Sequence, residues 1–79
     1  MNTHPAYNYT AVTPNDSTDL SGGPCRAIYV GTGGDVTVYP KGSTTEVTFK
    51  NVATGAVLPV VAQRIRATNT TATNLVALY

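Results

Sequence analysis

Two residues of this chain, Cys25 and His4, carry the side chains of a nucleophile and a general base. Such a pair works when the imidazole takes the thiol proton and leaves a nucleophilic thiolate. However, His4 lies in a segment with little apolar surface, and Cys25 begins a predicted strand, where cysteine is usually a small buried apolar residue. The sequence therefore favours a structural cysteine, and we predict that the protein is not an enzyme.

The acidic residues offer neither a pair spaced for general acid and base chemistry nor a set of metal ligands. Asp16 and Asp19 lack the further ligands of a calcium loop, and one cysteine with one histidine does not make a zinc site. We expect no metal and no cofactor. Asp16 and Asp19 are expected to cap a turn or to face solvent.

Arg64 and Arg66 alternate with apolar residues, so they are expected on one face of a strand. Two interpretations are open. The arginines form a solvated face, joined across the sheet by Lys50 or Glu46, or they form a contact stripe for an acidic partner, since arginine is enriched at interfaces.

The length of 79 residues allows one domain, whose core is small enough to need support. The single Cys25 excludes an internal disulfide. Charged residues are only 11% of the chain, against about 25% in an ordinary soluble domain. An uncharged polar surface suits packing against other protein subunits, so we expect a homo-oligomer.

Three classes of partner or location are disfavoured by composition. The net charge of +1 gives no electrostatic footprint for nucleic acid. The chain has no apolar run of the length that spans a membrane. Its first residues lack the basic and apolar regions of a signal peptide, so we expect synthesis in the cytosol.

Residues 1–24 contain three of the five prolines and few aliphatic side chains, and we predict that they form an extended N-terminal arm. A turn is expected at residues 15–17, where Asn, Asp and Ser favour capping. The arm is either a disordered tail or a segment that lies on a neighbouring subunit. The candidate interaction residues of the chain are Tyr7, Tyr9, Val12, Asp16, Leu20, Arg64 and Arg66.

Residues 25–79 have the alternation and the β-branched content of strands and are predicted to form one β module. Gly31, Gly33 and Gly34 are assigned to a hairpin loop rather than a phosphate cradle, because a strand and not a helix follows them. A turn is expected at residues 40–43, and Pro59 is expected at a strand start, an edge or a bulge. The predicted strands are residues 25–30, 35–39, 44–50, 57–67 and 75–79.

The fold class predicted from this pattern is all-β, a small antiparallel β-sandwich or partly open barrel. The final strand is expected inside the sheet, because it ends the chain on apolar residues. The predicted core consists of Ile28, Val36, Val38, Val47, Phe49, Val61, Ile65, Leu75 and Ala77.

Several short stretches resemble the sequences of a known family: VTPND at residues 12–16, GPCRAIYVG at 23–31, and GDVTV at 34–38. They are followed by LP at 58–59, RI at 64–65, AT at 67–68, TTAT at 70–73, and a final LY. Over roughly residues 10–79, the chain resembles the spike-base or head-decoration proteins of tailed phages and of phage-like gene transfer agents.

The resemblance implies a structural virion protein on the outside of a capsid, made in the cytoplasm of a bacterial host. Its implied partners are the major capsid protein, further copies of itself as a trimer or pentamer, and a spike or fibre protein. Because the chain is short for a complete spike base, carrying a fibre and cementing the shell are both open. The alternative function is an OB-like nucleic-acid-binding module, in which Tyr29 and Tyr39 would stack on bases.

Overall fold

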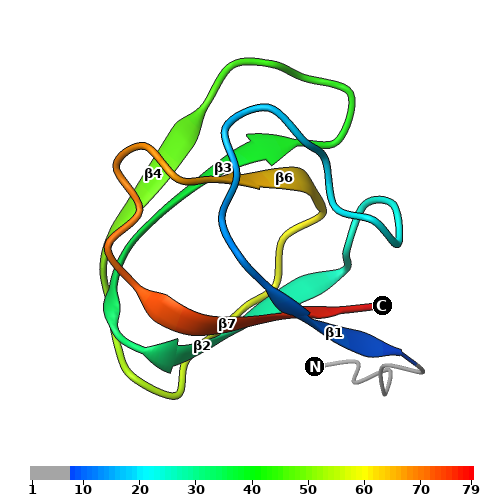
Figure 1. Cartoon of the computed structure of the whole chain (residues 1–79). Helices are drawn as coiled ribbons and strands as arrows, with labels where there is room; N and C mark the ends of the chain where they lie inside the picture. The colour runs from blue at the N-terminus through cyan, green and yellow to red at the C-terminus, as the bar shows by residue number, and fades with distance from the viewer. Residues whose placement is uncertain (1–7) are drawn as a thin grey trace.

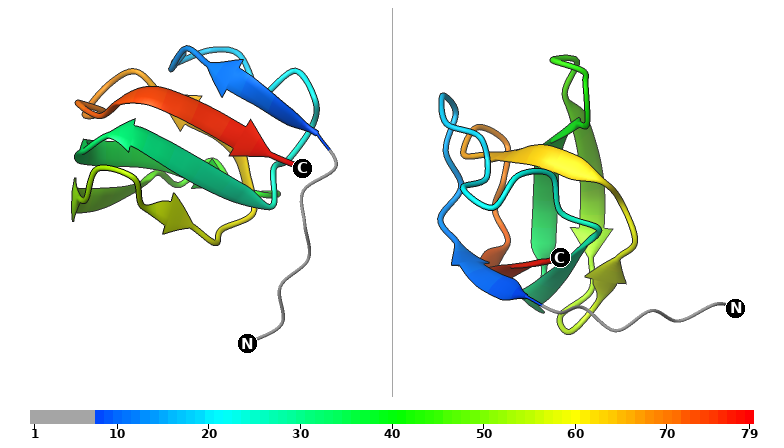
Figure 2. Two further views of the ribbon diagram at one scale, coloured as in Figure 1. Left: turned by 90° about the horizontal axis from the view of Figure 1, so that it is seen from below. Right: turned by 90° about the vertical axis from the view of Figure 1, so that its right-hand side faces the viewer.

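The computed structural model describes residues 8–79, which form two antiparallel sheets and no helix that could cross a membrane (Figure 1). The four-stranded sheet has the order β1-β7-β2-β5, and the three-stranded sheet has the order β4-β3-β6. The sheets pack face to face without closing into a barrel (Figure 2), so the predicted all-β class is confirmed as a sandwich. The strands are β1 (Tyr9–Val12), β2 (Ala27–Thr32), β3 (Gly34–Pro40), β4 (Val47–Val52), β5 (Val57–Leu58), β6 (Ala62–Arg66) and β7 (Thr73–Leu78).

The core lies between the two sheets and takes side chains from alternate positions of β2, β3 and β7, and from Ala62 and Ile65 of β6. Most of the predicted core is confirmed: Phe49 is partly buried against it, and the fully buried members are Ile28, Val36, Val38, Ile65, Leu75 and Ala77. Four further members of the core cluster were absent from the predicted core, Val30, Ala62, Ala72 and Cys25, although Cys25 was expected to be buried.

Two residues predicted in the core are on the surface, Val47 with 45% and Val61 with 50% of its area exposed. Val47 pairs with Val38, but it begins the edge strand β4 and therefore lies at the rim of the core. Val61 lies in the break between β5 and β6, outside the ladder that fixes which side chains point inward.

That break also corrects the single strand predicted for residues 57–67. β5 pairs with β2 in one sheet, whereas β6 pairs with β3 in the other. Pro59 follows β5 directly and has no N–H to continue the ladder, so the chain leaves the first sheet there. Its position after a short edge strand agrees with the edge placement predicted from the sequence.

The hairpin predicted around Gly31 and Gly34 is wrong, because β2 and β3 belong to different sheets. The chain crosses between the sheets at Gly33. A Cβ atom on Gly33 would lie 2.5 Å from the Val52 carbonyl oxygen and 2.8 Å from the Thr54 nitrogen. Glycine is needed here for close backbone approach rather than for a tight turn.

The turn predicted at residues 40–43 is confirmed, and it opens the exposed loop of residues 41–46 between β3 and β4. The Ser43 N–H donates to the Pro40 carbonyl oxygen at 3.0 Å, and Gly42 has a φ of 77°. This is the positive φ that the third residue of a type II turn requires. Gln63 fastens the start of the loop, accepting from the Gly42 N–H at 3.0 Å and donating to the Ser43 carbonyl at 3.2 Å.

The final strand β7 lies inside its sheet between β1 and β2, as its apolar sequence predicts. β1 comes from the segment predicted to be an arm, and it pairs with β7 of the same chain. Val12 and Leu20 pack against the core, and the N–H groups of Asn15 and Leu20 donate to the carbonyls of β6 at 2.9 and 2.8 Å. Residues 8–24 thus make contacts with both sheets of their own chain, which neither the disordered tail nor the arm on a neighbouring subunit had anticipated. The domain boundary at residue 24 stays a prediction.

Candidate functional site

The outer face of the three-stranded sheet carries a cluster of charged side chains around Tyr39. Arg64 pairs across the ladder with Tyr39, so the two residues share a face, and Arg66 is on the same side of β6. The guanidinium carbons of Arg64 and Arg66 lie 5.0 and 5.1 Å from the centre of the Tyr39 ring. Both distances fit cation–π contact, and Arg66 Nη1 also donates to the Tyr39 hydroxyl at 2.7 Å.

The acidic partners of these arginines come from the same chain. Arg64 Nε lies 2.8 Å from Asp19 Oδ1, and Arg66 Nε lies 3.2 Å from Asp16 Oδ1. A third carboxylate, that of Glu46, lies 3.4 Å from Arg66 Nη1. The link to Glu46 was one of the two that the sequence suggested, whereas Asp19 was not predicted as a partner. The arginines are therefore neutralised internally.

Asp16 makes the densest contacts of the cluster. Its carboxylate accepts hydrogen bonds from the Thr68 N–H at 2.9 Å and the Thr68 hydroxyl at 2.7 Å, besides the bond from Arg66. These bonds from Thr68, with the help of Arg66, lower the pKa of Asp16 to about 2. The predicted turn positions the carboxylate: Asn15 Oδ1 accepts from the N–H groups of Ser17 and Thr18 at 2.8 and 3.1 Å.

Thr37 is fully buried beside this cluster, although it points to the outer face of its sheet. Its N–H donates to Thr70 Oγ1 at 2.9 Å, and its hydroxyl donates to the Asn69 carbonyl at 3.1 Å. The loop after β6 therefore folds back over β3. The sequence shows only a run of Thr and Asn here, and no local signal marks which threonine is covered.

The structure divides the predicted interaction residues between two places. Asp16, Arg64 and Arg66 meet in the charged cluster, and Val12 and Leu20 are half-buried against the core. Tyr9 is 70% exposed on β1, and Tyr7 lies outside the described residues. Their role in binding a partner stays a prediction.

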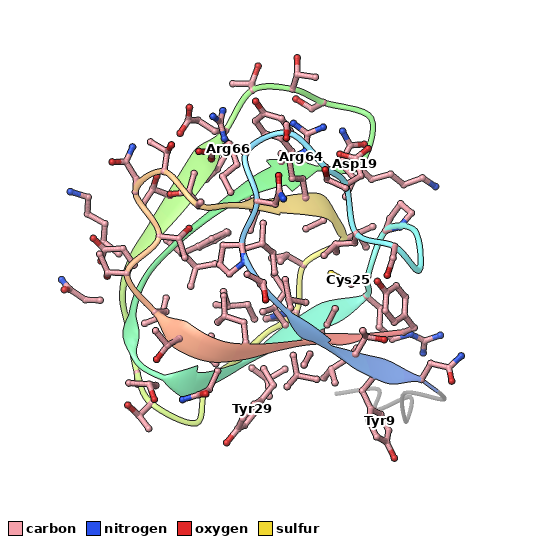
Figure 3. All side chains as sticks on the ribbon, viewed as in Figure 1. Tyr9, Asp19, Cys25, Tyr29, Arg64 and Arg66 are labelled. Carbon is pink, nitrogen blue, oxygen red and sulfur yellow. The ribbon has the colours of Figure 1, made fainter. Side chains whose placement is uncertain are left out.

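On the opposite side of the sandwich, the outer face of the four-stranded sheet is apolar. Register places its side chains in neighbouring pairs: Tyr9 opposite Leu78, Tyr29 opposite Val76, and Tyr29 opposite Val57. Figure 3 shows Tyr9 and Tyr29 projecting from this side, away from Arg64 and Arg66. We call this surface the apolar face; its residues are Tyr9, Ala11, Ala27, Tyr29, Val57, Val76 and Leu78.

Comparison with known proteins identifies the family. No family model and no curated protein matches the chain. A solved structure described as the capsid of a native GTA particle computed with C5 symmetry contains a chain that is 40% identical, with a TM-score of 0.83. The match covers 95% of this chain and 84% of that chain. The chain belongs to the capsid-associated proteins of phages and gene transfer agents.

In this capsid-associated protein, the residues first examined for chemistry have structural surroundings. Cys25 is 1% exposed, and burial raises the pKa of its thiol, so the reactive thiolate is disfavoured. His4 lies outside the described residues. Within residues 8–79, no three His, Cys, Asp or Glu side chains gather as a metal site.

Proposed function

We propose that this protein is a structural component bound to the outside of a phage-type or gene transfer agent capsid. It serves there as a decoration (cement) protein or as the base of a head spike. The observation that carries the proposal is the 40% identity, over 95% of the chain, to a chain in a GTA capsid structure. The principal partner is the major capsid protein, and the site of action is the virion exterior.

The described structure supports a role in binding rather than catalysis. Its charged side chains are used to hold the chain's own segments together, as in the pairs of Arg64 with Asp19 and Arg66 with Asp16. A rigid module with one charged and one apolar side suits permanent assembly into a larger particle.

A homo-oligomer, either trimer or pentamer, is part of the proposal. A small core gains stability when subunits bury surface against each other, and homo-oligomers generally close with cyclic symmetry. A trimer suits a position between capsomers, and a pentamer suits a vertex that carries a spike or fibre. Native mass spectrometry of the protein, alone and released from particles, tests this.

Electron cryomicroscopy of particles made with and without this chain tests the location. We expect additional density on the outer surface only when the chain is present. Density on the inner surface, or particles that never contain the chain, would overturn the proposal. We also propose synthesis in the cytoplasm of a bacterial host, which tracking of a tagged chain before assembly tests.

The same pair of samples separates the two finer roles. A cement protein raises the temperature at which the shell opens, so particles without it open at lower temperature. A spike base leaves that temperature unchanged, but particles without it lose their fibres.

The OB-like nucleic-acid-binding alternative gains no support from the geometry. Tyr39, one of the two tyrosines suggested for base stacking, is buried beneath Arg64 and Arg66. The other, Tyr29, lies on a face without charged residues, whereas single-stranded nucleic acid is bound in basic grooves.

A further inference from the structure

The apolar face departs from the usual pattern of an antiparallel sheet, which buries one face and presents polar side chains on the other. Here the inner face supplies Ile28, Leu75 and Ala77 to the core, and the outer face is apolar as well. Among the exposed side chains are Tyr9 at 70%, Tyr29 at 39% and Val57 at 52% of their area. Seen from below in Figure 2, the strands of this face are uncovered by the other described segments.

None of the seven residues of the apolar face is charged, and Figure 3 shows Asp19, Arg64 and Arg66 on the opposite side of the sandwich from Tyr9 and Tyr29. The charged cluster over the three-stranded sheet consists of Asp16, Asp19, Glu46, Arg64 and Arg66. Arg26 and Lys41 line a hollow beside Val61. Asp35 and Lys50 line a hollow beside Thr48.

The edges of the three-stranded sheet are poor sites for adding a strand from a partner. The free edge of β6 receives the N–H groups of Asn15, Leu20 and Cys25, so the chain covers this edge itself. β4 carries Lys50 and, at Asn51, a positive φ of 56° that interrupts its extended backbone. Charge and irregular backbone both discourage edge pairing at β4, so the apolar face is a better candidate for docking than either edge of the three-stranded sheet.

We propose that the apolar face is the surface that docks on the capsid shell, against an apolar area of a shell subunit with recesses for the rings of Tyr9 and Tyr29. This inference rests on the proposed function and adds the orientation: the charged cluster then points away from the shell. Exposed aromatic side chains in an apolar surround are the usual anchors of protein interfaces.

The size of the face argues for the shell rather than a second copy of the chain. The seven residues of the face, about 6.8 Å apart along strands that are about 4.8 Å from each other, cover on the order of 200 Å². A stable complex of two free proteins buries roughly 800 Å² on each partner. Two copies meeting only through this face fall short, whereas a shell subunit can extend the contact around the rim, where Asn8, Asn74 and Ala56 lie.

The test uses the full chain, shells assembled from the major capsid protein of the same particle, and a matched pair of valines. Val57→Glu places a charge on the apolar face, and Val47→Glu places the same charge on an exposed strand valine outside it. Tyr29→Glu is a second change on the face. We expect Val57→Glu and Tyr29→Glu each to weaken co-sedimentation with shells by roughly tenfold or more, and Val47→Glu to bind as the wild type does.

Val57→Thr and Val47→Thr repeat the comparison with a side chain of valine's shape in which a hydroxyl replaces one methyl group. Thermal melting establishes that each variant is folded. Folded face variants that bind shells like the wild type would overturn this inference and leave the proposed function standing. A wild type that binds no shells overturns both. Light scattering provides the remaining outcome: a wild-type dimer that Val57→Glu dissociates would make a second copy the occupant and overturn docking on the shell.

Discussion

Arg66 contacts Tyr39 in two ways: its Nη1 donates to the phenol oxygen at 2.7 Å, and its guanidinium carbon lies 5.1 Å from the centre of the same ring. The Tyr39 hydroxyl accepts a hydrogen bond that orients the guanidinium of Arg66, and the Tyr39 ring packs against the same guanidinium. Arg66 is thereby held in position to bind Asp16 and Glu46. Tyr39 thus supports both arginines whose ion pairs with Asp16 and Asp19 help to fasten residues 15–20 to the sandwich.

Tyr39→Phe tests this arrangement by removing the hydroxyl and keeping the ring. We expect the melting temperature to fall by a few degrees, because Arg66 loses the acceptor that orients it. Tyr29→Phe is the matched control, since the Tyr29 hydroxyl makes no hydrogen bond within residues 8–79 and its removal should change nothing. Equal melting temperatures for the two variants would contradict the role assigned to Tyr39.

The stability of the protein should depend on pH through Asp16. Its folded-state pKa of about 2 lies below the ordinary value of 3.8, so the ionised carboxylate stabilises the fold above about pH 4. This stabilisation is lost as the pH falls from about 4 to about 2. Melting of the wild type and Asp16→Asn should therefore differ at pH 6 and converge near pH 2. A difference that persists at pH 2 would show that the charge is not the cause.

Cys25 should be unreactive in the native protein. Its thiol is buried and its pKa is raised, so a maleimide at pH 7 should modify it only when the chain opens. We expect labelling in urea to be complete while native labelling is still slight, as intact-mass measurement will show. Rapid native labelling would mean that the segment around Pro24 opens far more easily than its contacts indicate.

Ile65 and Val61 were both predicted in the core, and truncation distinguishes them. Ile65→Ala removes a fully buried side chain and should cost about 2–5 kcal/mol of unfolding free energy. Val61→Ala acts at a half-exposed site and should cost within about 0.5 kcal/mol. Chemical denaturation measures both, and comparable losses would argue against the burial described for β6.

Two truncations test the boundary of the predicted arm. Removing residues 1–7 leaves every described contact in place, so melting should be unchanged. Removing residues 1–24 takes away β1, the Leu20 side chain and Asp16, and should abolish cooperative melting. A chain of residues 25–79 that melts cooperatively would instead support the arm as a unit separable from the β module.

The features that could be predicted from the sequence are those set by residues close to one another in the chain. Alternation predicted strands and most of the core, and Pro40 with Gly42 predicted a turn. The pairing of strands was not predictable in this way, because a loop with Gly31 and Gly34 fits a hairpin and a crossover equally well. What excludes the hairpin is the approach of Gly33 to the Val52 carbonyl, a contact between distant parts of the chain.

The charged cluster shows the same limit. The sequence indicated that Arg64 and Arg66 share a face and suggested Glu46 as a partner. It could not indicate that Asp19, 45 residues away, would lie 2.8 Å from Arg64. That contact depends on where the chain passes after β1, which the hydrogen bonds from Asn15 and Leu20 to β6 fix.

The loop of residues 41–46 makes this chain suited to displaying foreign peptides on a particle. Gln63 fastens only its beginning, and Thr44 and Thr45 are exposed between Ser43 and Glu46. The loop leaves the sandwich at the end of β3, away from the apolar face (Figure 1). A peptide inserted between Thr44 and Thr45 would therefore extend into solvent without touching the core. On a particle that carries many copies of the chain, the insert would be repeated at each attachment point with one orientation.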